Sequence, residues 1–338
     1  MRGRHVLGAV LALAALALAG CTGQQAVLDP RGPAAAHLAE FSWLLFWGGA
    51  AIFAFTMAML AIGLVFTDWT KRTPPIRLVV WLGLAFPVVT LLALTVYTAA
   101  VGRWVDLGRG QDGGEPPLRV DVVGQQYWWE VTYHDGQGGT VTSANELNIP
   151  VGRRVEVHLA SRDVIHSFWV PSLHGKMDLI PGRTNTITIQ ADTPGVIRGQ
   201  CAEFCGEQHA LMAFFVVAHE SAAFEAWLAA RRQPARVPEM PDLVAGQRAF
   251  LAAGCGSCHV VRGLAEGPYA AVGQLGPDLT HVGSRLSLAA GTLPNGVGPL
   301  AAWIADAQDL KPGNRMPSFH HLDSETLTSI ARYLGSLE

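Results

Sequence analysis

Two thiols, an imidazole and a thioether fall within residues 201–212, in the pattern Cys201-x3-Cys205-x3-His209-x2-Met212. This soft ligand set favours copper over magnesium, calcium or manganese. The alternative is a disulfide between the two cysteines, with the histidine and methionine nearby by coincidence. The pattern alone leaves both interpretations open.

A compact loop rarely closes a copper site alone, so a ligand from another part of the chain is expected. His166, within the segment Asp163-Val164-Ile165-His166-Ser167, is the best candidate. A histidine in an apolar, strand-like segment is by itself more often structural than a ligand. The soft ligands at 201–212 make the ligand interpretation the better one.

A second reactive cluster is Cys255-x2-Cys258-His259, which has the spacing of covalent c-type heme attachment. In this motif the two thiols add to the heme vinyl groups and the histidine supplies the proximal nitrogen. The alternative is a cytosolic redox-active Cys-x2-Cys pair. An export signal argues against that alternative.

The elements that position these residues begin with such a signal. Arg2 and Arg4 precede an apolar run that is too short to span a bilayer, and small residues follow it, which predicts a signal peptide over 1–20. Its end, Leu18-Ala19-Gly20-Cys21, resembles a bacterial lipobox, and this implies lipidation of Cys21. Ordinary cleavage nearby, leaving a free thiol at Cys21, is the alternative.

Residues 38–101 are expected to form two transmembrane helices, at about 41–67 and 78–101, because neither stretch contains a charged residue. Lys71, Arg72 and Arg77 lie between them and indicate a cytoplasmic turn, with both ends of the hairpin outside. A buried helix pair of a soluble protein is the alternative. The net charge of −3 gives no sign of a nucleic-acid partner.

The region 115–220 changes to short alternating segments separated by Gly and Pro turns, which predicts an antiparallel β-sandwich or barrel. A helix at 221–232 and a Pro-rich linker to 241 follow, and a helical domain is expected over 242–338, with Asp242 as its first N-cap. The predicted strands are 118–123, 126–134, 154–159, 186–190 and 213–217, and the predicted later helices are 297–307 and 324–337.

The copper-type loop, the His166 segment and the run Lys176-Met177-Asp178-Leu179-Ile180-Pro181-Gly182-Arg183 together resemble subunit II of the heme-copper oxidases. The resemblance covers about 38–230 and implies a cupredoxin domain that carries a binuclear CuA centre. It further implies that Cys201 and Cys205 bridge two copper ions, that His166 and His209 each bind one, and that Met212 and the Glu203 carbonyl are weak axial ligands.

The resemblance also assigns residues around the copper loop. It implies that the Glu203 side chain helps to hold magnesium or manganese at the interface with subunit I, and that Asp178 and Arg183 face the same interface. A solvated carboxylate is the alternative for Glu203. The aromatic run Tyr127-Trp128-Trp129 resembles a strand beside the copper site that serves the electron path.

Two departures from the family pattern limit this interpretation. The position at which the family takes up electrons is a tryptophan, and here it is Tyr127, which puts direct donation by a soluble cytochrome there in doubt. Many relatives place a carboxylate near the start of the second membrane helix, whereas residues around Val79 and Val80 are apolar. Proton uptake through that entrance is therefore not predicted.

Residues 242–338 resemble a small class I cytochrome c. Met316, in Lys311-Pro312-Gly313-Asn314-Arg315-Met316-Pro317, resembles the distal axial methionine, which raises the heme potential. Pro277 matches the proline whose carbonyl orients the proximal histidine. The rival axial ligands are His281, His320 and His321.

A CuA subunit with a fused cytochrome c resembles the caa-type bacterial terminal oxidases. The resemblance implies that heme c takes electrons from a quinol:cytochrome c reductase or a cytochrome c and passes them through CuA to heme a of subunit I, where O2 is reduced, with subunit III as a further partner. The expected location is the bacterial inner membrane, with both soluble domains on the outer face. The alternatives are a CuA-type nitric oxide reductase and a free-standing electron-transfer lipoprotein.

Overall fold

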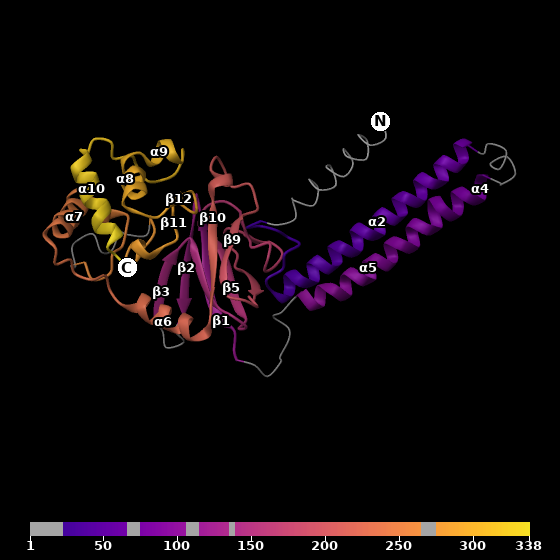
Figure 1. Ribbon diagram of the computed structural model, residues 1–338, viewed down its shortest axis with the longest axis horizontal. Helices are drawn as coiled ribbons and strands as arrows, with labels where there is room; N and C mark the ends of the chain where they lie inside the picture. The colour runs from indigo at the N-terminus through magenta and orange to yellow at the C-terminus, as the bar shows by residue number, and fades with distance from the viewer. Residues whose placement is uncertain (1–22, 66–74, 106–114, 135–138, 265–274) are drawn as a thin grey trace, which may run out of the picture.

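The computed structural model describes residues 23–65, 75–105, 115–134, 139–264 and 275–338. Three parts follow one another along the molecule: a pair of long helices, a β-sandwich and a small helical domain (Figure 1). The predicted signal peptide, Cys21 and the predicted turn with Lys71 and Arg72 lie outside the described residues.

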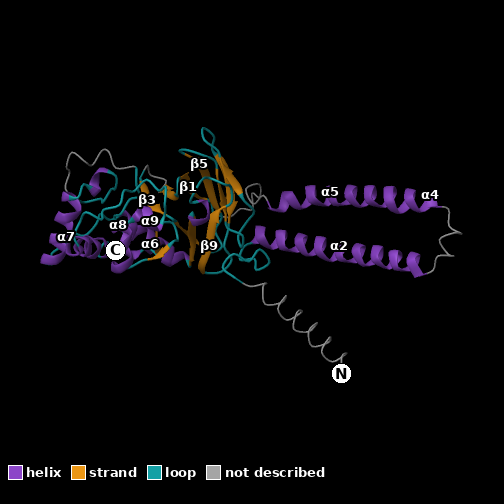
Figure 2. Ribbon diagram, turned by 90° about the horizontal axis from the view of Figure 1, so that it is seen from above, coloured by secondary structure: helices purple, strands orange, loops and turns teal. Residues whose placement is uncertain are grey.

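The paired helices are α2, Pro33–Val65, and a second rod built from α4, Pro75–Leu78, a π-helical segment, Val79–Ala85, and α5, Phe86–Val105. They lie side by side in both views (Figures 1 and 2). Both are long and apolar enough to cross a bilayer. Helix α2 begins before the predicted residue 41, because its first turns pack on the β-sandwich, where Ala35 N–H donates to the Leu173 carbonyl at 3.2 Å.

The β-sandwich consists of two five-stranded sheets, with strand orders β3-β2-β1-β5-β8 and β4-β10-β9-β6-β7. The expected all-antiparallel arrangement is wrong at two places, since β1 pairs in parallel with β5, and β4 in parallel with β10. The strands are β1 Leu118–Gln125, β2 Trp128–His134, β3 Thr140–Ala144, β4 Glu146–Pro150, β5 Val155–Ser161, β6 His166–Trp169, β7 Met177–Leu179, β8 Asn185–Ile189, β9 Gly195–Cys201 and β10 Ala213–His219.

An aromatic cluster fills the sandwich close to the predicted copper loop. The Phe168 and Phe214 rings stack with centroids 4.8 Å apart, and Trp129 packs on Phe214 at 5.1 Å. Alternate residues of β2 are buried, as expected for a strand with one face on the core. The ends of β6 and β9 are therefore held on a rigid base.

The C-terminal part starts with α6, Ser221–Arg232, which packs on the sandwich, and continues into a helical domain with its own core around Phe250 and Tyr333. Helix α7 begins at Pro241 with Met240 as its N-cap, so Asp242 lies in the first turn rather than at the predicted cap; proline fits the first helical position because its missing N–H is not needed there. The remaining elements are α7 Pro241–Ala252, the 3-10 turns Cys255–Ser257 and Val282–Ser284, β11 Ser287–Leu288, β12 Leu293–Pro294, α8 Val297–Ala305, α9 Ala307–Leu310 and α10 Ser324–Gly335.

This helical domain packs against the side of the sandwich that lies away from the membrane-type helices (Figures 1 and 2). The buried Glu146 carboxylate of β4 accepts a hydrogen bond from Leu286 N–H across the boundary. Arg262 donates to the carbonyls of Arg231 and Arg232 at the end of α6. The two domains thus share a bonded interface beyond the linker.

Candidate metal centre and heme cavity

The predicted copper ligands converge at one end of the sandwich. His166 is the first residue of β6, and Cys201 is the last residue of β9. The loop between β9 and β10 supplies Cys205, His209 and Met212. A ring nitrogen of His166 and the two Sγ atoms lie within 4.8 Å of one another, and His166 Nδ1 is 3.9 Å from Cys201 Sγ. Cys205 Sγ is 3.7 Å from His209 Nδ1 and 3.8 Å from Met212 Sδ, and Cys201 Sγ is 3.2 Å from the Glu203 carbonyl oxygen.

The two cysteines are free and buried, with their sulfurs 3.8 Å apart, which is far longer than an S–S bond. The hydrogen bond from the Cys205 thiol lowers the pKa of Cys201, with His166 contributing in the same direction. The bond to Cys201, together with burial, raises the pKa of Cys205. The two sulfurs thus differ in how readily they ionise, and a soft cation would stabilise thiolates here by neutralising their buried charge.

Asp163 orients the His166 ring. Its Oδ1 lies 2.9 Å from His166 Nε2 and accepts from Val164 N–H, while its Oδ2 accepts from Gln126 N–H at 2.8 Å. Burial raises the pKa of Asp163, but these hydrogen bonds outweigh it and keep the pKa below its ordinary value. An ionised Asp163 holds the proton on Nε2 and leaves Nδ1 free to face the sulfurs.

The aromatic segment before β2 supports the loop from the other side. Gln126 Nε2 donates to the Cys205 carbonyl at 2.7 Å, and the Tyr127 hydroxyl accepts from Glu207 N–H at 3.0 Å. Gly206 lies between them at φ +126°, and a Cβ there would come within 2.5 Å of the Tyr127 hydroxyl. Only glycine fits this position without displacing Tyr127.

The side chains predicted to face subunit I lie on the outer side of the loop. Lys176 Nζ is 3.4 Å from Glu203 Oε2 and 3.8 Å from Asp178 Oδ1, so these two carboxylates share one cation. Arg183 is exposed in the turn after β7. Phe204, which follows Glu203 in the sequence, has 77% of its surface exposed and presents an apolar ring.

The heme motif lines a cavity of about 450 Å³. Cys255, Cys258 and His259 lie in its wall together with Met316 and Pro277. His259 Nδ1 is 2.8 Å from the Pro277 carbonyl oxygen, which fixes the ring with Nε2 free. Burial lowers the pKa of His259 and keeps the imidazole neutral, as a ligand must be.

The three rival histidines do not line this cavity among the residues that the structure describes. His281 instead lies between the Gln233 and Glu338 carbonyls, at 3.1 and 3.0 Å. The cavity is predominantly apolar. Its two thiols fit covalent attachment of a heme, and its histidine and thioether fit the two axial positions.

The β-sandwich supplies part of the same cavity wall, through Gln126, Tyr127, Trp128 and Asn145. Trp129 instead is buried in the aromatic core, with its ring centroid 6.2 Å from that of His166. The sequence indicated the aromatic run but not this division, and it missed the contribution of Lys311, which lines the cavity and is 2% exposed. A lysine next to Pro-Gly carries no local signal of burial.

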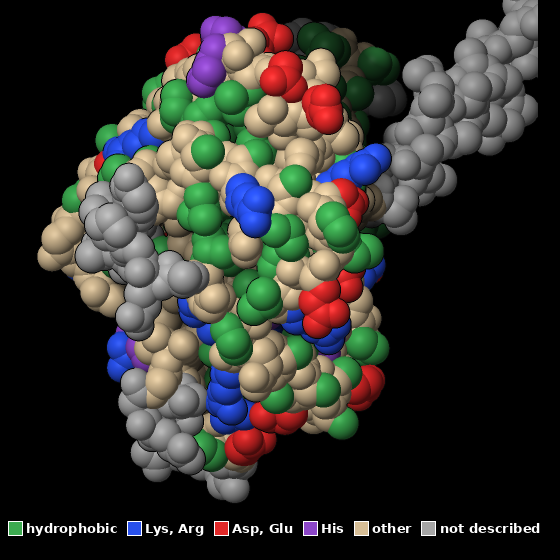
Figure 3. Space-filling view, turned by 90° about the vertical axis from the view of Figure 1, so that its left-hand side faces the viewer, with side chains coloured by type: hydrophobic (Ala, Val, Ile, Leu, Met, Phe, Trp, Pro, Cys, Tyr) green, Lys and Arg blue, Asp and Glu red, His purple; other side chains and the backbone are tan. Residues whose placement is uncertain are grey.

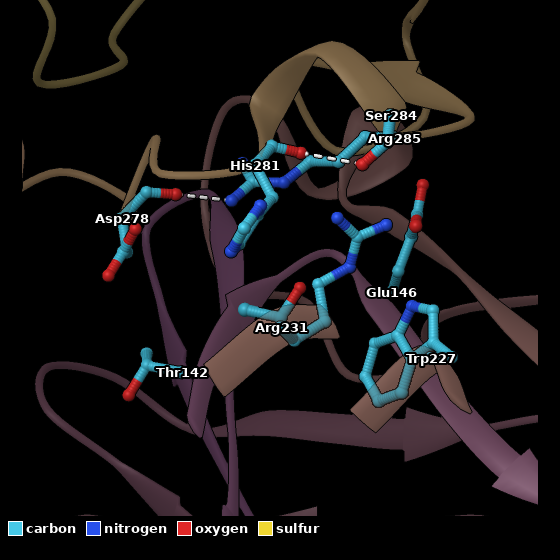
Figure 4. Close-up of a pocket in the computed structure, with 9 residues that line it drawn as sticks. Thr142, Glu146, Trp227, Arg231, Asp278, His281, Ser284 and Arg285 are labelled. Carbon is cyan, nitrogen blue, oxygen red and sulfur yellow. Dashed lines mark hydrogen bonds between the residues drawn. The ribbon is translucent and has the colours of Figure 1, made fainter. Parts of the chain in front are cut away.

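A polar pocket continues the domain interface away from the heme cavity (Figure 4). Arg231 extends toward Glu146, and Arg285 donates to the Asp278 carbonyl. Burial raises the pKa of Glu146, although hydrogen bonds from Leu286 and attraction to Arg285 act in the opposite direction. The buried carboxylate is thus compensated by groups of both domains.

The fold and the site define a class: a chain with two apolar helices, a cupredoxin-like β-sandwich with a candidate metal site, and a cytochrome c domain. Two family profiles match, "Cytochrome C oxidase subunit II, periplasmic domain" over residues 130–219 and "Cytochrome c" over residues 243–338.

The cytochrome c oxidase subunit 2 of Alkalihalophilus pseudofirmus is 33% identical, covering 97% of this chain and 96% of that protein. The same subunit from Bacillus sp. (strain PS3) is 34% identical over 75% of this chain and 72% of its own length. Among solved structures, the periplasmic domain of subunit II of cytochrome oxidase from Bradyrhizobium japonicum is 30% identical, with a TM-score of 0.33, over 35% of this chain and 96% of that one.

The chain belongs to the cytochrome c oxidase subunit 2 family, in a form with a C-terminal cytochrome c domain. It is therefore a subunit of an oxidoreductase, a cytochrome c oxidase, and its two electron-transfer domains fit a role in electron entry to that enzyme. The family and the two apolar helices fit a membrane-anchored protein.

Proposed function

We propose that this subunit takes up electrons at a single covalent heme c, passes them to a binuclear copper centre, and delivers them to heme a of subunit I, where O2 is reduced to water. The observation that carries the proposal is the wall shared by the two sites. Tyr127 lines the heme cavity and also accepts a hydrogen bond from Glu207 in the copper loop.

In this proposal the Cys201 and Cys205 thiolates would hold the copper together with His166 and His209, whose Nδ1 atoms face the sulfurs. Met212 and the Glu203 carbonyl are weaker ligands. When bound, two copper ions that share thiolates spread one electron over both metals. The chain contributes a dry, rigid enclosure, because Cys201, Cys205 and Met212 are at most 3% exposed, and fixed ligands need little rearrangement.

The heme would be attached to Cys255 and Cys258 and ligated by His259 and Met316. Pro277 holds the proximal ring through its carbonyl. The face of the molecule farthest from the paired helices carries charges of both signs among hydrophobic side chains (Figure 3). This mixed surface suits transient docking of an upstream donor, a quinol:cytochrome c reductase or a cytochrome c.

The exit side of the proposal is the face with Glu203, Asp178 and Arg183. There Glu203 would help to bind magnesium or manganese at the contact with subunit I, and subunit III would complete the complex. The helix pair would span the bacterial inner membrane twice, with both soluble domains outside. Export by a signal peptide over 1–20 and lipidation of Cys21 complete the proposed topology.

Purification of the tagged complex, followed by optical and EPR spectra, tests the proposal. Heme c, heme a and a mixed-valence copper signal in one complex are the expected result. Zinc at Cys201 and Cys205 would overturn the copper assignment. Nitric oxide reduction without oxygen reduction would support the reductase alternative, and purification without a large heme-containing partner would support the free-standing carrier.

A further inference from the structure

The loop that carries Met316, residues 311–316, contacts the β-sandwich at both of its ends. The β-sandwich, which carries the candidate copper ligands, is called the copper domain below. At its start, the Lys311 ammonium donates to the Tyr127 carbonyl at 2.9 Å, the Leu211 carbonyl at 2.8 Å and the Ala289 carbonyl at 2.9 Å. An ammonium group has three N–H donors, so these three acceptors use all of them. Two of the acceptors belong to the copper domain, and Leu211 directly precedes the ligand Met212.

At the other end of the loop, Arg315 contacts Asp163, on the His166 side of the copper site. Its Nη2 lies 3.1 Å from Asp163 Oδ2, and Asp163 Oδ1 lies 2.9 Å from His166 Nε2. A hydrogen-bonded chain thus runs from the residue before Met316 to a copper ligand. Asp163 is only 12% exposed in its side chain, whereas Arg315 is 50% exposed.

Between these ends the loop lies flush on the copper loop. Gly313 has φ +76°, and a Cβ there would come within 2.7 Å of Glu207 Oε2. Glu207 is the residue whose N–H is held by Tyr127. Lys311, Gly313 and Arg315 therefore each bring the Met316 loop close to the segments that carry the candidate copper ligands.

We propose that the heme domain completes the outer hydrogen-bond shell of the copper site, with Lys311 and Arg315 as positioning residues for the copper ligands. Lys311 fixes the backbone on the Met212 side, and Arg315 fixes Asp163 and through it His166. The inference rests on the proposed electron transfer between heme c and copper. With both cofactors bound, Lys311 and Arg315 would hold the electron donor and the electron acceptor in a single arrangement.

The test uses Arg315→Gln and Lys311→Met in the full chain, purified in its complex. Arg332→Gln is the matched control, because Arg332 also forms an exposed ion pair on the heme domain, with Asp242 at 3.9 Å, but stays within that domain. The readouts are the copper EPR signal, the retention of copper against a chelator, and the rate of heme-to-copper electron transfer after flash photolysis.

We expect altered copper hyperfine splitting and a roughly 10- to 100-fold loss in copper retention or transfer rate in both variants, as for other residues that orient metal ligands. The control should match the wild type. Arg315 is half exposed, and Asp163 keeps its bonds from the Gln126 and Val164 N–H groups without it, so Arg315→Gln should keep its fold and its heme spectrum. If Lys311→Met fails to fold, Arg315→Gln alone decides.

Variants that show the EPR signal and transfer rate of the control would overturn the inference while leaving the proposed function intact. A wild-type complex without a copper EPR signal or heme c would instead remove the proposed function itself. An unchanged copper signal with slower transfer would also overturn the claim that these residues position the copper ligands.

Discussion

The substitution Asp163→Asn tests the orientation of His166 directly. Each carboxylate oxygen serves two donors: Oδ1 faces His166 and Val164 N–H, and Oδ2 faces Gln126 N–H and Arg315. An asparagine has only one acceptor oxygen. One pair of donors must therefore face the new NH2 group, whichever way the amide turns.

The expected cost follows from two lost hydrogen bonds. A buried hydrogen bond contributes about 0.5–1.5 kcal/mol, so the loss is about 2 kcal/mol. If this loss falls on the metal-bound state, it corresponds to a roughly 30-fold weaker copper affinity, since about 1.4 kcal/mol is a factor of ten. Competition with a copper chelator in the purified full chain measures it.

Asp121→Asn is the control for this experiment. Asp121 likewise serves a histidine and an arginine, with His134 Nε2 at 2.7 Å and Arg119 Nε at 3.3 Å, but it lies on β1 outside the copper loop. Copper affinity should not change in this variant. An Asp163→Asn chain that binds copper within about threefold of the Asp121→Asn chain would refute the reasoning, because the calculated loss exceeds RT several times over.

Three further predictions follow. Tyr127→Phe removes the hydroxyl that accepts from Glu207 N–H but keeps the aromatic ring in the cavity wall. Because the ring is kept, flash photolysis should show little change in the rate of heme-to-copper transfer, and a hundredfold fall would contradict the prediction. Met316→Leu preserves apolar volume but removes the thioether, and the reduced heme should then bind carbon monoxide, as read from its optical spectrum; failure to bind would point to another axial ligand. Burial raises the pKa of Glu146 in the folded protein. As the pH rises, the carboxyl of the unfolded chain therefore loses its proton before that of the folded chain. The wild type should lose stability relative to Glu146→Gln over the pH range between the unfolded and the folded pKa. Melting temperatures in detergent between about pH 5 and about pH 8 check this, and the opposite trend would exclude a raised pKa.

The candidate ligand residues could be predicted because most of them lie in short sequence motifs with characteristic spacings. Cys201 to Met212 and Cys255 to His259 each form one local motif, and His166 could be found because a soft-metal loop needs a second source of ligands. The structure places all the predicted copper ligands around one point and the predicted heme ligands around one cavity. Whether they bind those groups stays a prediction.

Several strands escaped prediction because their sequences lack alternation. Strand β4 is buried along its whole length, although it contains Glu146 and Asn148, and β9 contains Gly195 and Gly199. The parallel pairings are also invisible in the sequence, since they depend on crossovers rather than on composition. Periodicity reports which face of a strand is buried, but it does not report the neighbour.

The hydrogen-bonded interface between the β-sandwich and the C-terminal helical domain could not be predicted either. Lys311 and Tyr127 are 184 residues apart, and the pairing exists only once both domains have folded and docked. Burial lowers the pKa of Lys311 to about 7, yet the three carbonyls around it favour the ammonium form, because only that form has three donors. Such compensation depends on three segments meeting and has no local signature.

The length of α2 has a consequence for the height of the copper site above the membrane. A helix of 33 residues is about 50 Å long, whereas the hydrocarbon core of a bilayer is about 30 Å thick. If the apolar run from residue 41 spans a bilayer, the first eight residues of α2, about 12 Å of helix, would lie outside it and end against the β-sandwich, where Arg31 N–H donates to the Ser172 carbonyl. In the proposed topology such a spacer would leave the candidate metal loop little freedom to rise or tilt, so the anchor itself would set the height of the site above the membrane.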